Sequence, residues 1–334
     1  MKEGHLRLIL FCSLLGGAFW FLPASAEWHQ VAWNGMGTRI SMELWVEDAK
    51  KVEGLVAGVR QQFDSLELLM SRHLPEAELY TLNLAAPSRS VKVTPLLFEV
   101  IQKALAFSEL SQGAFDITVA AVGRDYDFRN KVQPDEALIR AHLPGVGYQH
   151  ILLFPSQMEI RFTHPETSID LGGIGKGFAL DQVAEWLRQK GVRNAVITAG
   201  GDTRFLGDRR GRPWVVGVQD PRDRTRMALS IPLENEAIST SGDYERYFIG
   251  EGGERVHHIL SPLTGRPTAG LQSVSVIGPV ATSTDALSTT LFVMGVVKGL
   301  ALINRTPGYE AIMIDQHHKV HYSEGLSEPV QPEK

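Results

Sequence analysis

The sequence predicts an α+β fold. Segments that alternate apolar and polar residues, as strands do, outnumber the helical segments, and the two kinds mix without strict alternation. A doubly wound parallel sheet would require strand and helix to alternate regularly, so this order favours α+β. No internal repeat and no linker divides residues 27–326, and we expect them to form a single domain.

The first half of the domain is predicted to begin with strands and continue with helices. Residues on both sides of Gly35-Met36-Gly37-Thr38 alternate in polarity, which is typical of strands. Thr94-Pro95 marks a later helix start, because proline is favoured at the first helical position. The predicted elements are strands within 32–46, helices at 48–69, 78–83 (a short helix or turn) and 94–111, a charged loop at 124–135, and a hairpin of 148–154 and 159–162.

The second half is predicted to contain most of the strands and two further helices. A strand-like run at 167–169 leads through a glycine-rich segment into a helix at 178–189. Another helix is expected at 284–294, with Ser283 as its cap. The remaining predicted strands are 195–198, 214–218, 227–231, 237–241, 247–249, 273–277, 309–315 and 320–322.

Both ends of the chain lie outside the predicted domain. A basic start, an apolar core at 8–22 and the small residues Ala24-Ser25-Ala26 predict a signal peptide over residues 1–26. We therefore expect export, to the periplasm in a Gram-negative source. The alternative is an uncleaved segment that leaves the protein attached to the inner membrane, although the apolar core is shorter than the about 20 residues of a span. Residues 327–334 are expected to form a disordered tail.

Composition excludes several function classes. The only cysteine, Cys12, lies in the predicted signal peptide, so the mature chain would be held by its core rather than by disulfides. The net charge of −5 argues against a nucleic-acid-binding face. The 11 histidines do not fall at zinc-finger or H-x-x-x-H spacings, so no zinc site is expected.

Residues 170–177 (DLGGIGKG) form the most informative segment of the chain. Four glycines lie between a strand-like run and a helix start, where backbone N–H groups and the helix dipole suit a phosphate group. Lys176 adds a cation and Asp170 adds an acceptor or a metal ligand. The segment matches neither the P-loop nor the dinucleotide fingerprint. The alternative is a glycine-rich turn that only packs tightly.

A second group of polar residues lies on the predicted helix 284–294. Asp285 and Thr289 stand four residues apart, which places them on one face. A carboxylate, a hydroxyl and a backbone carbonyl would form a hard oxygen set that suits Mg²⁺. The alternative is that Ser283, Thr284 and Asp285 only cap the helix.

The adjacent histidines His257 and His258 lie beside a polar turn. A histidine in such a place can act as a general base near neutral pH. The alternative is a structural or surface role, as also expected for His317-His318.

Taken together in this order, these segments resemble the ApbE family of FAD:protein FMN transferases. The resemblance extends over nearly the whole mature chain. It is carried by Met36-Gly37-Thr38, Met70-Ser71-Arg72 with Leu82-Asn83, Gly113-Ala114-Phe115-Asp116, and residues 170–177, 194–202, 240–244, 257–265 and 284–289.

The resemblance implies an ApbE-like, T-fold-related architecture of two lobes with the flavin in the cleft between them. It implies Mg²⁺-dependent transfer of FMN from FAD to a threonine or serine hydroxyl of a partner protein, through a phosphoester bond and with release of AMP. The expected partner is a membrane-associated electron-transfer subunit.

The resemblance also implies roles for particular residues. Those that fall where the family contacts FAD are Met36, His73, Ala114, Phe115, Asp116, Asp170, Lys176 and Ile259. The carbonyl of Gly173 and the side chains of Asp285 and Thr289 fall where it binds the metal. His258 and Asp285 are the expected catalytic residues, with His258 as a base near the acceptor hydroxyl.

Three positions depart from the family pattern. His73 stands where an aromatic residue is common, Ser261 replaces the usual aspartate before Pro262, and Cys12 does not fit a lipoprotein site. Two alternative functions use the same residues: a Mg²⁺-dependent FAD pyrophosphatase that releases FMN and AMP, and a non-catalytic FAD-binding protein.

Overall fold

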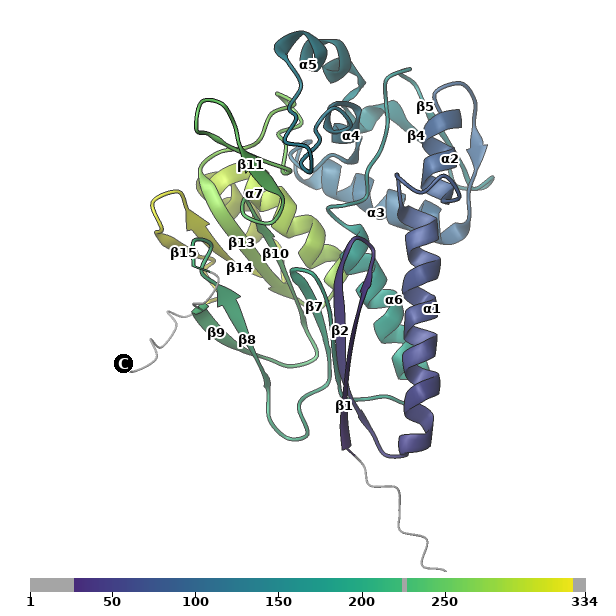
Figure 1. Ribbon diagram of the computed structural model, residues 1–334, viewed down its shortest axis with the longest axis vertical. Coiled ribbons are helices and arrows are strands. Elements are labelled where there is room, and N and C mark those ends of the chain that lie inside the picture. Colours follow the sequence, from purple (N-terminus) through teal and green to yellow (C-terminus); the bar gives the residue numbers. More distant parts are fainter. Residues whose placement is uncertain (1–26, 224–226, 327–334) are drawn as a thin grey trace, which may run out of the picture.

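An eight-stranded sheet forms the centre of the molecule in the computed structural model, which describes residues 27–223 and 227–326 (Figure 1). Every neighbouring pair of strands is antiparallel. In spatial order the strands are β1 (Glu27–Gly35), β2 (Thr38–Val46), β6 (Ala195–Ala199), β7 (Asp202–Leu206), β10 (Ala237–Gly242), β13 (Leu271–Gly278), β14 (Glu310–Asp315) and β15 (Val320–Tyr322).

Three smaller sheets surround the central one. They comprise β3 (Val91–Lys92), β5 (Glu159–Phe162) and β4 (Ile151–Phe154); the pair β8 (Trp214–Gln219) and β9 (Met227–Leu233); and the pair β11 (Tyr247–Ile249) and β12 (Arg255–His257). The β8–β9 pair packs on the central sheet through an apolar cluster that includes Trp214, Phe205 and Ile277.

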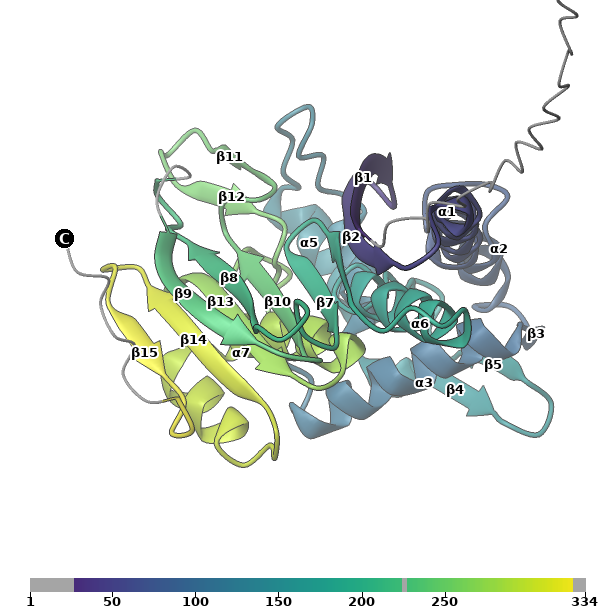
Figure 2. The same ribbon diagram turned by 90° about the horizontal axis from the view of Figure 1, so that it is seen from below.

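Helices cover the opposite face of the central sheet (Figure 2). The helices are α1 (Val52–Met70), α2 (Glu78–Ala85), α3 (Pro95–Leu110), α4 (Ala120–Gly123), α5 (Glu136–His142), α6 (Gly175–Gln189) and α7 (Ala281–Ile303). Helix α7 packs on β10 and β13, α6 packs beside α7, and α1 packs on α6. The apolar residues that predicted α1, among them Val59, Phe63 and Leu66, are buried in the main core.

Helix α7 has an unusual sequence and an interrupted backbone. Within the described ranges it is the one helix that is long and apolar enough to span a membrane, but half of that stretch is buried inside the protein, as in a core helix. Gly295 has φ 75°, a left-handed conformation that glycine adopts without strain, and it breaks the helix before its last two turns.

The N-termini of α6 and α7 cap each other. Asp181 on α6 accepts hydrogen bonds from the N–H groups of Ala281 (3.0 Å) and Thr282 (2.8 Å) at the start of α7. In return, Asp285 Oδ2 on α7 accepts a hydrogen bond from the N–H of Gly177 (2.9 Å) in the first turn of α6. Free N–H groups of both helices thus find their acceptors on the neighbouring helix.

The predicted α+β class is confirmed, with several errors in individual elements. Helix α7 begins at Ala281 and not at residue 284, so Ser283 is not its N-cap. Residues 167–169 form no strand, and strands β7 and β12 were not predicted. The predicted signal peptide and tail lie outside the described residues, and the single-domain assignment stays a prediction.

Candidate functional site

Lys176, in the first turn of α6, lies between two buried carboxylates. Its Nζ is 2.6 Å from Asp202 Oδ2 and 3.5 Å from Asp285 Oδ1. Asp202 opens β7 and Asp285 lies in the second turn of α7, so a strand and two helices meet here. No role was predicted for Asp202, although it belongs to one of the motifs on which the resemblance rests.

The charges in this cluster depend on one another. Burial alone would lower the pKa of Lys176, but the two carboxylates outweigh it and raise that pKa above its usual range. Burial and the nearby charge of Asp202 raise the pKa of Asp285, which Lys176 partly opposes. The cluster therefore has one ammonium for two carboxyl groups, so Asp285 can take up either a proton or a further cation.

The glycines of 170–177 have mainly packing roles. The N–H groups of Gly172, Gly175 and Gly177 donate to Asp170 Oδ1, the Leu171 carbonyl and Asp285 Oδ2, respectively. These three N–H groups are thus engaged within the protein instead of facing a phosphate. A side chain at Gly177 would overlap the carbonyl of Ala281, so this glycine lets α6 and α7 approach each other. The tight-packing alternative is correct for Gly177, while Lys176 carries the charge.

The three predicted metal ligands lie on neighbouring parts of α7 and the glycine-rich segment. Asp285 and Thr289 are one turn apart on α7, and a Cβ at Gly173 would be 3.2 Å from Thr289 Oγ1. Asp285 Oδ2 is occupied by the Gly177 N–H, which leaves Oδ1 directed toward Lys176. A carboxylate, a hydroxyl and a backbone carbonyl suit Mg²⁺ as hard oxygen donors, so these residues fit the ion. Within the described ranges, no group of three or more His, Cys, Asp or Glu side chains forms a metal cluster.

His257 and His258 have different environments. His257 is buried, its Nε2 lies 2.8 Å from the Thr268 carbonyl, and its Nδ1 accepts the N–H of Ile259. These contacts agree with the structural role that was the alternative to a general base. His258 is exposed to solvent, and its ring lies edge-on to the ring of Phe128. Burial and then the charge of Arg246 lower the pKa of His258 to about 4, so the ring is neutral and able to accept a proton at pH 7.

Arg246 connects several of the predicted FAD contacts, although the sequence assigned it no role. Its carbonyl accepts the N–H of His258 (3.1 Å), and a Cβ at Gly37 would be 3.6 Å from its guanidinium. Burial lowers the pKa of His73, with Arg72 and Arg246 adding to the effect. Met36, next to Gly37, has φ 49° and donates its N–H to Glu67.

The remaining predicted FAD contacts differ in how accessible they are. Asp170 forms an ion pair with Arg72 (2.9 Å) and keeps part of its carboxylate exposed. Phe115 lies beside Gly173, since a Cβ there would be 3.2 Å from its ring, and Ala114 is half-buried. The Asp116 carboxylate is already bonded to the N–H groups of Thr118 and Tyr148, and burial raises its pKa. The Ile259 side chain is buried in the apolar cluster under α7.

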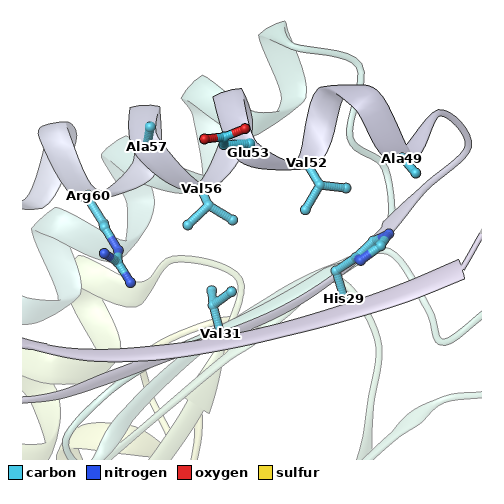
Figure 3. Close-up of a pocket in the computed structure, with 8 residues that line it drawn as sticks. All are labelled: His29, Val31, Ala49, Val52, Glu53, Val56, Ala57 and Arg60. Atoms are coloured by element: carbon cyan, nitrogen blue, oxygen red, sulfur yellow. The ribbon is translucent and has the colours of Figure 1, made fainter.

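A hollow between β1 and α1 contains none of these residues (Figure 3). Val31, Val52 and Val56 point into it, and Glu53 and Arg60 lie along its helix side. The chemistry described above therefore belongs to the α6–α7–β7 junction and not to this hollow.

The fold and the cluster define an α+β protein with a charged site at the paired N-termini of two helices. The ApbE family profile matches residues 36–313, and the chain belongs to this family. A Klebsiella pneumoniae protein named FAD:protein FMN transferase is 32% identical over 289 residues, which cover 85% of this chain and 88% of the relative. A Treponema pallidum protein of the same name is 30% identical, with 84% and 83% covered.

Solved structures agree with this membership. The ApbE protein of Thermotoga maritima matches with a TM-score of 0.82 and 31% identity, over 89% of this chain and 97% of that chain. The flavin transferase ApbE of Vibrio cholerae matches with a TM-score of 0.80 and 27% identity, over 90% and 98%. These matches support the predicted ApbE-like fold.

Proposed function

We propose that this protein transfers FMN from FAD to a threonine or serine hydroxyl of a partner protein, forming a phosphoester bond and releasing AMP. The names and extent of the similar proteins support the reaction class. The observation that carries the proposal is the convergence of Lys176, Asp285 and Thr289 at one junction.

The chain's own groups divide the work. Lys176 supplies the positive charge of the junction, which would stabilise negative charge that develops on the leaving AMP phosphate. His258 Nδ1 or Nε2 accepts the proton of the acceptor hydroxyl as its oxygen attacks the phosphorus of the FMN half. Asp285, Thr289 and the Gly173 carbonyl would hold Mg²⁺, which when bound neutralises the diphosphate oxygens.

Asp285→Asn is the sharpest test of this proposal. Alanine at this position would also remove the cap of α6, whereas asparagine can still accept the Gly177 N–H and loses only the charge. We expect flavin transfer to a co-expressed acceptor, seen as in-gel flavin fluorescence, to fall at least about a hundredfold. Normal transfer by Asp285→Asn in Mg²⁺ would contradict the metal assignment, and its unchanged circular dichroism would control for folding.

Incubation with FAD and Mg²⁺ in the absence of an acceptor separates the alternatives. Rapid release of FMN and AMP would favour the pyrophosphatase, and tight FAD binding without turnover would favour a carrier. A carrier has no use for a lysine and a metal site at the diphosphate, which favours an enzyme. We further propose, from the family resemblance, a membrane-associated electron-transfer subunit as acceptor and, from the predicted signal peptide, the periplasm as location.

A further inference from the structure

Asp202 is the buried charge in the cluster to which neither the sequence nor the proposed mechanism gives a role. It is 1% exposed, and its Oδ2 lies 2.6 Å from Lys176 Nζ. Burying a carboxylate is costly unless a partner compensates it. The contact with Lys176 is therefore the main compensation for this group.

The two carboxylates share Lys176 unequally. Its Nζ is 2.6 Å from Asp202 Oδ2 and 3.5 Å from Asp285 Oδ1, so it lies 0.9 Å closer to Asp202. The backbone of Asp202 is fixed on both sides, because it pairs with Ala199 of β6 and Ser239 of β10. The short Asp202 side chain on this fixed backbone has little reach, whereas the long lysine side chain can move between the two acids.

We propose that Asp202 is a positioning residue that holds Lys176 away from Asp285 and so keeps Asp285 Oδ1 available to a divalent cation. Asp285 Oδ2 is already taken by the Gly177 N–H, so Oδ1 is the oxygen for which an ammonium and a cation would compete. Without Asp202, Lys176 would pair with Asp285 alone and would compete with the cation for that oxygen. This role rests on the metal site of the proposed function and adds a residue that controls it.

A double-mutant cycle distinguishes positioning from a direct effect of charge. Calorimetric titration with MgCl₂, without FAD or acceptor, would be made on wild type, Asp202→Asn, Lys176→Met and the double variant. We expect Asp202→Asn to weaken Mg²⁺ binding about tenfold and Lys176→Met to strengthen it by a similar factor. If Asp202 acts through Lys176, its substitution should cost clearly less when Lys176 is absent.

An equal or larger cost of Asp202→Asn in the Lys176→Met background would overturn the proposal, because Asp202 would then attract or ligate the cation directly. Glu185→Gln, which removes an exposed carboxylate from the same helix, is the matched control and should leave the affinity unchanged. If Lys176→Met fails to fold by circular dichroism, Lys176→Gln replaces it in the cycle.

The outcomes also separate this inference from the function on which it rests. Saturable Mg²⁺ binding by wild type with a failed cycle would remove the role of Asp202 and leave the metal site intact. An absence of Mg²⁺ binding by wild type would overturn both the metal site and this inference, while the flavin-transfer assay would still report on the reaction itself.

Discussion

Replacing Gly177 with alanine would test whether the contact between α6 and α7 holds the site together. The added methyl would overlap the carbonyl oxygen of Ala281 and would lie 2.7 Å from Asp285 Cβ. Both helices are packed in the core, so relief requires α7 to move and the Gly177–Asp285 hydrogen bond to lengthen. Overpacking costs about 1–3 kcal/mol and loss of a hydrogen bond to a charged group about 1.5–3 kcal/mol.

The higher helix propensity of alanine returns about 1 kcal/mol, so we expect Gly177→Ala to lower the free energy of unfolding by about 2–5 kcal/mol. With a urea m-value of about 3 kcal/mol/M, the midpoint should fall by roughly 1 M, measured by circular dichroism. Gly54→Ala on α1 is the matched control, because a Cβ there has nothing within 4 Å and should be neutral or slightly stabilising. A Gly177→Ala midpoint equal to that of wild type would refute the close-approach argument.

Three further predictions concern neighbouring features. Because the pKa of His258 is lowered to about 4, the part of the flavin-transfer rate that depends on His258 should persist as the pH falls through about 6.5 and be lost only near about 4. A pH–rate profile measures this. A loss near pH 6.5 that is absent in His258→Asn would contradict the prediction. Gly295→Ala should cost about 1–3 kcal/mol in urea unfolding through the backbone alone, because φ 75° with ψ 176° is a region that only glycine readily occupies and no atom lies near the new methyl. Asp181→Ala should cost about 0.5–2 kcal/mol by uncapping α7, and a Glu185→Ala loss of equal size would argue against capping.

Features that depend on residues close together in the sequence could be predicted. The fold class was correct because it follows from such local patterns. Apolar spacing predicted helix α1. Pro95 predicted the start of α3 to within one residue. The start of α7 was missed because its capping group, Asp181, comes from another helix. Strand β11 (Tyr247–Ile249) was predicted because all three of its residues favour strands, whereas β12 has the same length but contains only Val256 of that kind and was missed.

The parts of the site that depend on residue type and on spacing along the chain could be predicted. Asp285 and Thr289 could be paired because four residues make one helical turn. The position of Asp202 depends on the register between β6 and β7, which spacing does not encode. His257 and His258 differ because successive side chains point to opposite sides at the end of β12. The sequence alone could not show which of the two points inward.

The pairing of β2 with β6 has a consequence for how the chain folds. Ile40 to Leu44 of β2 pair with Ala199 to Ala195 of β6, and every helix from α1 to α6 lies between them in sequence. Closing so long a loop loses chain entropy before the ladder contributes contacts, so topology makes this step slow. The β1–β2 hairpin can form early by itself, but it can join the sheet only after the chain has been synthesised at least as far as β6. Until then the edge of β2 that later pairs with β6 can pair with other chains. Aggregation would therefore begin from an early, incompletely folded form of this protein.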